Sequence, residues 1–337
     1  MNTERRPLVI LTGPTAVGKS ELSIMLAERI DGEIISADSM QVYRGMDIGS
    51  AKITKEQMRG IPHHLLDILE PSEEFNVVLF QQKAKQAMDG IYERGHIPIL
   101  VGGTGFYIQA VLYDIDFTEN DEDTAYRIKM ERYAEEHGNK ALYEKLWEVD
   151  PKACETIHEN NVKRVIRALE FHEKTGLKIS EHNETERNKQ SPYNFAYFVL
   201  NDDREKIYQN IDNRVDEMLR QGLEQEVLTL FQKGYTQKMV SMQGLGYKEM
   251  LSYLQGECSL EEAVYIIKRD TRHFAKRQLT WFRRERNVIW IDKQKWAYDN
   301  GQLLDAMLRT LREKGIWQES EMPEYRKIKR GQGEQWR

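Results

Sequence analysis

Residues 8–20 read Leu8-Val9-Ile10-Leu11-Thr12-Gly13-Pro14-Thr15-Ala16-Val17-Gly18-Lys19-Ser20. The apolar start of this stretch predicts a buried strand, and Glu21–Ala27 predicts a helix that begins directly after it. Between them, Gly13 to Ser20 match the pattern G-x-x-x-x-G-K-[ST], whose backbone curls around an anion at a helix N-terminus. The stretch therefore predicts a phosphate or diphosphate site, to which Lys19 adds a positive charge and Ser20 a hydroxyl ligand for Mg²⁺.

The loop alone leaves two kinds of chemistry open. A kinase uses such a loop to transfer a phosphoryl group, whereas another enzyme can use it to hold a diphosphate that leaves. Features further along the chain must decide between them.

Short apolar runs alternate with helical patterns, which predicts an α/β fold: a P-loop NTPase-like parallel sheet flanked by helices. The expected strands are Leu8–Leu11, Glu33–Ser36, His64–Ile68, Ile97–Val101, Phe195–Leu200 and Val288–Ile291. Expected helices include Phe80–Arg94, Tyr208–Lys233 and a basic helix from about Glu261 to Arg284.

The stretch 117–192 breaks this alternation and predicts an all-helical insertion domain. Helical spacing recurs in Tyr126–His137, Lys140–Val149 and Val162–Lys174, and the polar segment Glu181–Gln190 is expected to be a linker. We expect residues 1–116 and 193–318 to form the α/β core, interrupted by the insertion domain 117–192. Residues 319–337 are expected to form a mobile basic tail.

The 337-residue chain has a formal net charge of −6, but its charges are unevenly spread. Basic residues gather between Lys268 and Arg286, which indicates a surface that meets a polyanion. No apolar run reaches the roughly 18 residues of a membrane span, so we expect no membrane contact. Cys154 and Cys258 fit neither a disulfide framework nor a zinc site, and we expect a cytoplasmic protein.

Asp38 and a second glycine loop follow two further expected strands. Asp38 comes just after Glu33–Ser36, and Gly102-Gly103-Thr104-Gly105-Phe106-Tyr107 follows Ile97–Val101. Because the carboxyl ends of parallel strands meet at one edge of a sheet, both should lie near the phosphate loop. Asp38 could accept a proton or hold a metal-bound water, or it could cap the next helix. The glycine loop could approach a ligand closely or form a tight turn.

Several segments occur in a fixed order along the chain. They are Gly13–Ser20, Asp38-Ser39 with Tyr43–Lys52, His63–Asp67, Gly102–Tyr107, Arg164–Glu170, Gly244–Glu249 and Thr271–Arg283. In these segments the chain resembles the bacterial tRNA dimethylallyltransferases, over roughly residues 7 to 290.

The resemblance implies an enzyme that moves a dimethylallyl group from dimethylallyl diphosphate to an adenosine of tRNA. The acceptor is the exocyclic N6 amine of the adenosine 3′-adjacent to the anticodon, in tRNAs that read codons starting with U. Diphosphate leaves, which explains a phosphate loop outside a kinase. The implied cofactor is Mg²⁺, and the implied partner is the tRNA anticodon stem-loop, bound by a monomer that requires no protein partner.

The resemblance also implies roles for individual residues. Asp38 would take the proton from the amine, while Lys19 and Arg214 would be cations on the leaving diphosphate. The diphosphate would be bound by Gly13, Pro14, Thr15, Ala16, Val17, Gly18, Lys19 and Ser20. The residues implied in tRNA binding are Asp38, Ser39, Met40, Gln41, Thr104, Arg127, Lys163, Arg164, Val165, Ile166, Arg167, Gly246, Tyr247, Lys248, Lys276, Arg277, Gln278 and Arg283. From the sequence alone, a solvated helical charge is the better explanation of Arg214, so its role on the diphosphate rests on the resemblance.

Two other functions remain compatible with the phosphate loop. A P-loop small-molecule kinase is the main alternative, although it has no reason to carry the basic segment or the loop Gly102–Tyr107. A non-catalytic RNA-binding NTPase is the other, although no apolar strand followed by an acidic residue forms a clear Walker B segment.

Overall fold

The computed structural model of the protein describes residues 5–117 and 125–318. The chain divides into two compact units, one formed by Met1–Leu112 with Pro192–Arg337 and the other by Tyr113–Ser191. Each unit has its own hydrophobic core. The sequence placed the insertion at 117–192, and the expected basic tail, 319–337, lies outside the described residues.

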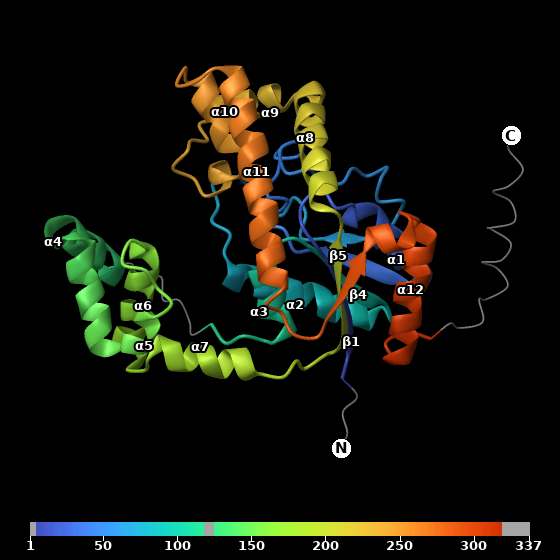
Figure 1. The fold of residues 1–337 in the computed structure, drawn as a ribbon, viewed down its shortest axis with the longest axis horizontal. Coiled ribbons are helices and arrows are strands. Elements are labelled where there is room, and N and C mark those ends of the chain that lie inside the picture. The colour runs from blue at the N-terminus through green and yellow to red at the C-terminus, as the bar shows by residue number, and fades with distance from the viewer. Residues whose placement is uncertain (1–4, 118–124, 319–337) are drawn as a thin grey trace, which may run out of the picture. The chain divides into compact units, whose positions relative to one another are not determined.

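The larger unit is built on a six-stranded sheet whose strands are all parallel, as the sequence predicted (Figure 1). The strands are β1 (Pro7–Thr12), β2 (Gly32–Ser36), β3 (His63–His64), β4 (Ile97–Gly102), β5 (Asn194–Asn201) and β6 (Val288–Asp292), in the order β3-β2-β4-β1-β5-β6. Central β1 is buried on both faces, so Leu8 to Leu11 form a continuous apolar run instead of an alternating one.

The third strand is shorter than the sequence predicted. The expected strand His64–Ile68 is wrong beyond its first residue, because β3 ends at His64. Leu65 and Asp67 have φ values of 64° and 52°, in the left-handed region that an extended strand cannot contain. A run of apolar residues carries no sign of such a backbone reversal.

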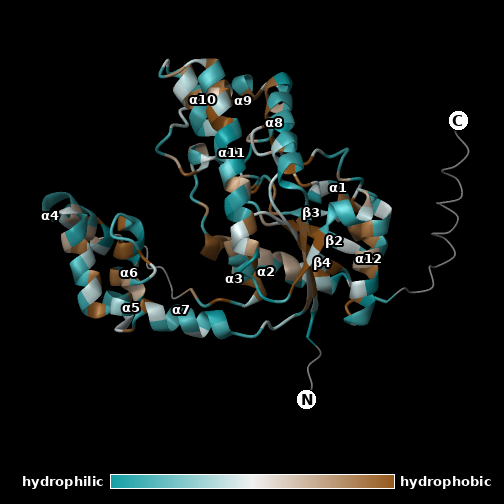
Figure 2. Ribbon diagram, viewed as in Figure 1, coloured by the Kyte–Doolittle hydropathy of each residue, from teal (hydrophilic) through white to brown (hydrophobic). Residues whose placement is uncertain are grey.

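Helices cover both faces of the sheet. On one face, α1 (Lys19–Ile30) and α12 (Asn300–Glu313) share a core with the strands. On the other, α2 (Val77–Glu93) and α3 (Gly105–Leu112) pack on β4. Figure 2 shows hydrophobic strands between helices whose outer sides are hydrophilic. The phosphate loop thus leads from a buried central strand to a covering helix.

The chain between β5 and β6 forms α8 (Arg204–Gln221), α9 (Leu223–Gln232), α10 (Tyr247–Leu254) and α11 (Leu260–Phe282). Short 3₁₀ turns lie at η1 (Ser241–Gln243) and, after β6, at η2 (Lys293–Trp296). The single helix expected over 208–233 is wrong, because Gly222, with a φ of 99°, separates α8 from α9. In Figure 1, α8 and α11 run side by side above the sheet, and they pack on each other.

The smaller unit is helical. Its elements are α4 (Ala125–Val149), α5 (Pro151–Cys154), α6 (Val162–Thr175) and α7 (Ile179–Asn188), and α4 is kinked at Gly138. The linker expected over Glu181–Gln190 is wrong, since most of it belongs to α7. Among the helices of the described residues, none combines the length and the apolar character needed to cross a bilayer.

Candidate active site

The phosphate loop, Gly13–Ser20, joins β1 to α1. Gly18 has a φ of 92° and precedes the first residue of α1, where no side chain caps the helix. The side chain of Lys19 folds back over the loop, and its Nζ donates to the carbonyl oxygens of Gly13 (3.0 Å) and Pro14 (2.8 Å). Uncapped N–H groups at a helix N-terminus, beside a lysine, suit an anion.

Three charged side chains lie close enough to shift one another's pKa values. Burial lowers the pKa of Lys19 to about 7, with a further decrease from the positive charge of Arg214, while Asp38 acts in the opposite direction. Burial raises the pKa of Asp38, although Met40 N–H donates to its Oδ1 (2.8 Å). Burial also lowers the pKa of Arg214, whose guanidinium makes no hydrogen bond or ion pair with any described residue. The site thus holds desolvated charges that its own side chains leave unpaired.

Gln278 of α11 connects two loops of this site. Its Oε1 accepts a hydrogen bond from Thr15 N–H (2.9 Å), and its Nε2 donates to the carbonyl oxygen of Gly103 (3.0 Å). The residue is 6% exposed. The resemblance implied an RNA contact for Gln278, but this burial leaves its amide no access to RNA.

The second glycine loop is rich in glycine because other backbone and side-chain groups approach it closely. A Cβ on Gly102 would collide with Ala37, one on Gly103 with Gln278, and one on Gly105 with Trp281. None of these glycines has a positive φ, so the turn itself does not require glycine. Packing of α11 and of the end of β2 explains the glycines better than close approach of a ligand.

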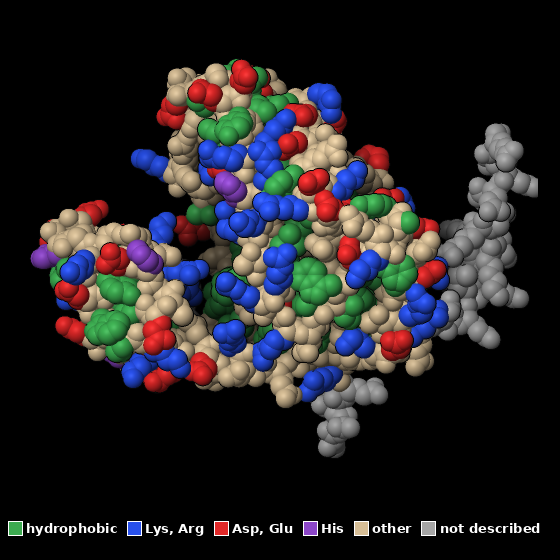
Figure 3. All heavy atoms as spheres, in the orientation of Figure 1, with side chains coloured by type: hydrophobic (Ala, Val, Ile, Leu, Met, Phe, Trp, Pro, Cys, Tyr) green, Lys and Arg blue, Asp and Glu red, His purple; other side chains and the backbone are tan. Residues whose placement is uncertain are grey.

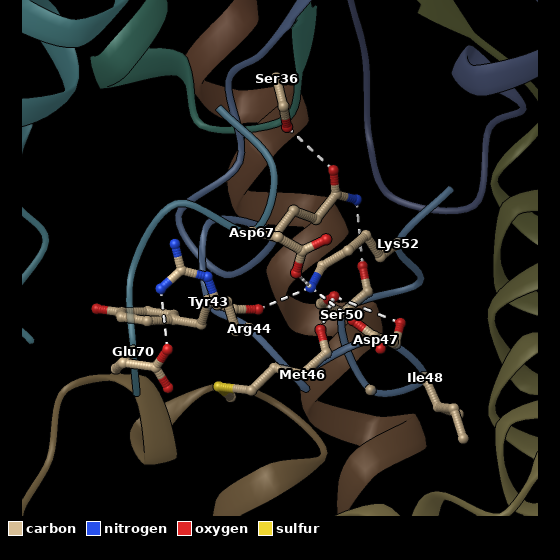
Figure 4. A network of polar contacts seen from close by, with 12 residues as sticks. Ser36, Tyr43, Arg44, Met46, Asp47, Ile48, Ser50, Lys52, Asp67 and Glu70 are labelled. Atoms are coloured by element: carbon tan, nitrogen blue, oxygen red, sulfur yellow. Dashed lines mark hydrogen bonds and ion pairs between the residues drawn. The ribbon is translucent and has the colours of Figure 1, made fainter. Parts of the chain in front are cut away.

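A buried lysine stabilises the segment that follows Asp38 (Figure 4). The Nζ of Lys52 donates to the carbonyl oxygen of Tyr43 (2.7 Å) and forms ion pairs with Asp47 and Asp67, both at 2.6 Å. Its side chain is 4% exposed. The charged residues of this motif therefore hold its backbone in place.

Glu226 of α9 supports the same segment from outside. Its carboxylate accepts hydrogen bonds from the N–H groups of Asp47 (2.9 Å), Ile48 (2.7 Å) and Gly49 (3.0 Å), and from the hydroxyl of Tyr247 (2.8 Å). Tyr247 is fully buried, so its side chain braces this segment and is not exposed to RNA.

A separate charge cluster lies at the amino end of β2. Glu33 accepts hydrogen bonds from Arg94 Nε (2.8 Å), from His64 Nε2 (2.7 Å) and from His96 Nδ1 (2.7 Å). His63 bonds instead to a backbone carbonyl. Both histidines of the segment His63–Asp67 therefore bond to groups of the protein itself.

Lysines and arginines gather along α11 on the face shown in Figure 3. Those nearer its amino end form ion pairs: Lys268 with Asp216 (2.5 Å) and Arg272 with Asp212 (2.7 Å) of α8, and Arg269 with Asp270 (2.8 Å) of α11 itself. Toward the carboxyl end, the exposed basic residues without an ion pair to any described residue are Lys276, Arg277, Arg283 and Arg284. This second group is available to a polyanion.

In the helical unit, α6 separates the residues implied in tRNA binding into two sets. Lys163, Arg164 and Arg167 are exposed. Val165 and Ile166 are buried in the core of the unit, which keeps their side chains from RNA. Arg127, on α4, is partly exposed and forms an ion pair with Glu170 (2.8 Å).

The remaining residues implied in tRNA binding belong to the larger unit. Half-buried side chains follow β2 and β4, at Ser39, Met40, Gln41 and Thr104. Gly246 is buried and donates its N–H to Glu249, while Lys248 is half-buried and pairs with the same glutamate (3.3 Å).

Lys293 of η2 was not identified from the sequence. Its Nζ donates to the carbonyl oxygen of Val17 (3.2 Å) and lies 3.1 Å from where a Cβ on Gly18 would stand. The available signal was its position directly after a strand of a parallel sheet, at the edge where ligands bind.

Ser20 is the residue of the phosphate loop that could hold Mg²⁺. Its side chain is exposed, and its hydroxyl makes no hydrogen bond to any described residue. The described residues contain no group of three His, Cys, Asp or Glu side chains that could hold a metal by themselves. A single hydroxyl fits Mg²⁺, which commonly takes its other ligands from substrate phosphates and water.

Two family models match the chain. One, described as "IPP transferase", matches residues 41–285, and the other, described as "Isopentenyl transferase", matches residues 7–74. Among curated proteins, the chain is 62% identical to a tRNA dimethylallyltransferase of Lachnoclostridium phytofermentans over 92% of this chain and 99% of the relative. It is 50% identical to a tRNA dimethylallyltransferase of Carboxydothermus hydrogenoformans over 86% of this chain and 92% of the relative.

Solved structures give the same result. A full-length tRNA isopentenylpyrophosphate transferase from Bacillus halodurans is 44% identical, with a TM-score of 0.68 over 93% of this chain and 98% of that one. A eukaryotic dimethylallyltransferase acting on tRNA is 30% identical, with a TM-score of 0.78 over 95% of this chain and 83% of that one.

Proposed function

The chain belongs to the IPP transferase family, the tRNA dimethylallyltransferases, and we propose that it transfers a dimethylallyl group to tRNA. The donor is dimethylallyl diphosphate. The acceptor is the exocyclic N6 amine of the adenosine 3′-adjacent to the anticodon, in tRNAs that read codons starting with U. Diphosphate is the second product.

The observation that best supports this chemistry is the unpaired charge around the phosphate loop. Lys19 and Arg214 are desolvated cations, so an anion bound between the loop and these side chains would be strongly stabilised. Asp38 lies beside them with a raised pKa, as expected of a group that accepts a proton. The leaving diphosphate needs the cations, and the proton that leaves the amine needs the acceptor.

In the proposed reaction, the amine attacks the carbon that bears the diphosphate. The C–N bond forms as the C–O bond breaks, and the diphosphate leaves with the electron pair. Loop N–H groups, Lys19 and Arg214 stabilise the charge that develops on it. The amine proton passes to the carboxylate of Asp38. Mg²⁺, held by Ser20 and the diphosphate, would supply further positive charge when bound.

Exposed and partly exposed basic side chains of both units are proposed to contact tRNA. They are Arg127, Lys163, Arg164, Arg167, Lys276, Arg277 and Arg283. Half-buried Ser39, Met40, Gln41 and Thr104, with Asp38, are proposed to surround the extruded adenine. Val165, Ile166, Tyr247 and Gln278 are left out because their side chains are buried. We further propose that the enzyme acts as a monomer in the cytoplasm.

The test is transfer of label from dimethylallyl diphosphate to unmodified anticodon stem-loop RNA with Mg²⁺. We expect labelled adenosine and no ATP hydrolysis in a parallel reaction. An RNA with guanosine at the target position should accept no label. ATP turnover without prenyl transfer would instead favour the P-loop kinase alternative.

A further inference from the structure

We infer that Gln278 is a positioning residue of this reaction, which fixes the phosphate loop against the second glycine loop from the RNA-facing helix. The inference rests on the proposed function, and it assigns to Gln278 a role other than RNA contact. Its first basis is geometry: one buried side chain bonds to Thr15 and Gly103, which lie 263 and 175 residues away in the chain.

The chemistry of these two bonds selects an amide. Thr15 offers an N–H, which can only donate, and Gly103 offers a carbonyl oxygen, which can only accept. A glutamine supplies one acceptor and one donor at the same distance from its backbone. A carboxylate would satisfy Thr15 and face the carbonyl oxygen of Gly103 with a second acceptor.

The bond to Thr15 also orients the phosphate loop. Because the N–H of Thr15 is directed to Gln278, it is withdrawn from the anion, which the later N–H groups and Lys19 must bind. Next along the loop, Ala16 belongs to the same buried cluster as Ala275, which lies one turn before Gln278 on α11. The inner face of α11 therefore sets the position of the loop.

The second glycine loop is fixed by the same face of α11. Gly103 and Gly105 leave just enough room for Gln278 and Trp281, and the N–H of Thr104 bonds to the carbonyl oxygen of Ala37 (3.3 Å), directly before Asp38. Gln278 thus connects the group that holds the diphosphate to the segment that holds the proposed base. A misplacement of about 1 Å between such groups costs on the order of 100-fold in rate.

Lys276 and Arg277 directly precede Gln278 but are exposed, and neither forms an ion pair with a described residue. Neighbouring residues of one helix therefore serve two purposes, and substitution can separate them. Gln278→Met keeps the length of the side chain and removes both hydrogen bonds. We expect kcat to fall about 10- to 100-fold, with RNA affinity within about twofold of wild type.

Lys276→Ala with Arg277→Ala should give the opposite pattern, a higher KM for RNA through lost phosphate contacts. Gln225→Met is the matched control, because Gln225 is exposed on α9 and bonds only within its own helix. It should leave both kcat and RNA affinity unchanged. Loss of RNA affinity in Gln278→Met, with kcat retained, would overturn the inference and make Gln278 an RNA contact.

Gln278→Glu adds a second measurement, the pH dependence of the rate, which a purely structural role would leave unchanged. A protonated carboxyl has one donor and one acceptor, so it can replace the amide, whereas the carboxylate cannot. The rate relative to wild type should therefore rise as pH falls. A pH-independent ratio would contradict the inference, and this variant also carries the test if Gln278→Met does not fold.

Binding of inorganic diphosphate separates this inference from the proposed function. We expect Gln278→Met to bind diphosphate about tenfold more weakly than wild type, because the loop is no longer held. Unchanged diphosphate affinity together with unchanged kcat would overturn the inference. Absence of prenyl transfer by the wild type would overturn the proposed function and leave the diphosphate measurement valid.

Discussion

Glu33 and Asp38 stand at the two ends of β2, and the charges around them are arranged in opposite ways. Glu33 is 2% exposed and accepts hydrogen bonds from an arginine and two histidines. The hydrogen bond from Arg94 is the main cause that lowers its pKa to about 2. Asp38, by contrast, has a raised pKa, and the nearby cations Lys19 and Arg214 make no ion pair with it.

The difference separates charges that stabilise the fold from charges that await a ligand. A buried carboxylate with every partner in place stabilises the native state when ionised. Desolvated charges without an ion-pair partner cost stability, and they persist where a substrate later supplies the opposite charge. Each prediction below tests one side of this comparison.

The largest effect is expected at Asp38. Asp38→Asn keeps the shape of the side chain but cannot accept the proton, so turnover should fall by roughly 10²- to 10⁴-fold. RNA affinity should stay near that of wild type, and thermal stability should not decrease, because a desolvated, half-buried charge is removed. Single-turnover prenyl transfer measures the rate, RNA titration measures the affinity, and thermal unfolding measures the stability. An unchanged rate would remove Asp38 as the base.

Glu33→Gln should lower the stability of the protein and leave its turnover unchanged. Removing the charge leaves Arg94 and two histidines with a weaker acceptor, and we expect a loss of about 2–3 kcal/mol of unfolding free energy. The folded molecules should retain the wild-type rate. Urea unfolding followed by circular dichroism measures the first, and activity per folded molecule measures the second.

The lowered pKa of Glu33 also predicts how the free energy of unfolding changes with pH. Glu33 has a lower pKa in the folded protein, about 2, than its ordinary value of 4.5, so the unfolded chain binds more protons between them. Its contribution is complete above about pH 4.5 and is lost as pH falls toward 2. Glu33→Gln should lose less stability than wild type over this range; equal losses would contradict the assignment.

Lys19 should couple diphosphate binding to a proton. Its pKa of about 7 in the free protein should rise when a diphosphate replaces the carbonyl oxygens of Gly13 and Pro14. Affinity for inorganic diphosphate should therefore fall above pH 7, by up to about tenfold per pH unit. Calorimetry in buffers of different ionisation enthalpy detects the proton taken up.

Lys19→Arg is the control for titration of the ligand itself, because a guanidinium stays protonated across this range. Its affinity should change less with pH than that of wild type. Identical pH profiles for the two proteins would mean that Lys19 is already charged before the diphosphate binds.

How far the sequence predicted these features depends on how local they are. The phosphate loop and Asp38 were predicted because each follows a strand directly, and the parallel sheet brings strand ends together. The break at Gly222 could not be separated from a tolerated glycine within a helix. The roles of Glu33, Gln278 and Lys293 depend on partners more than 25 residues away in the chain, so no local pattern reveals them.

The contrast between paired and unpaired charges also occurs around α6 of the helical unit. Glu170 is buried, 2.8 Å from Arg127 and 3.3 Å from Lys174, while Lys163 and Arg167 are exposed and have no ion pair with any described residue. Lys163→Ala with Arg167→Ala should weaken tRNA binding about tenfold and reduce the slope of log affinity against log salt by about 1.5, since each phosphate contact releases counterions. Lys174→Ala is the matched control, because its charge is already paired with Glu170. A double variant with the wild-type salt slope would show that α6 touches no phosphates, and its unpaired charges would then be an ordinary solvated face.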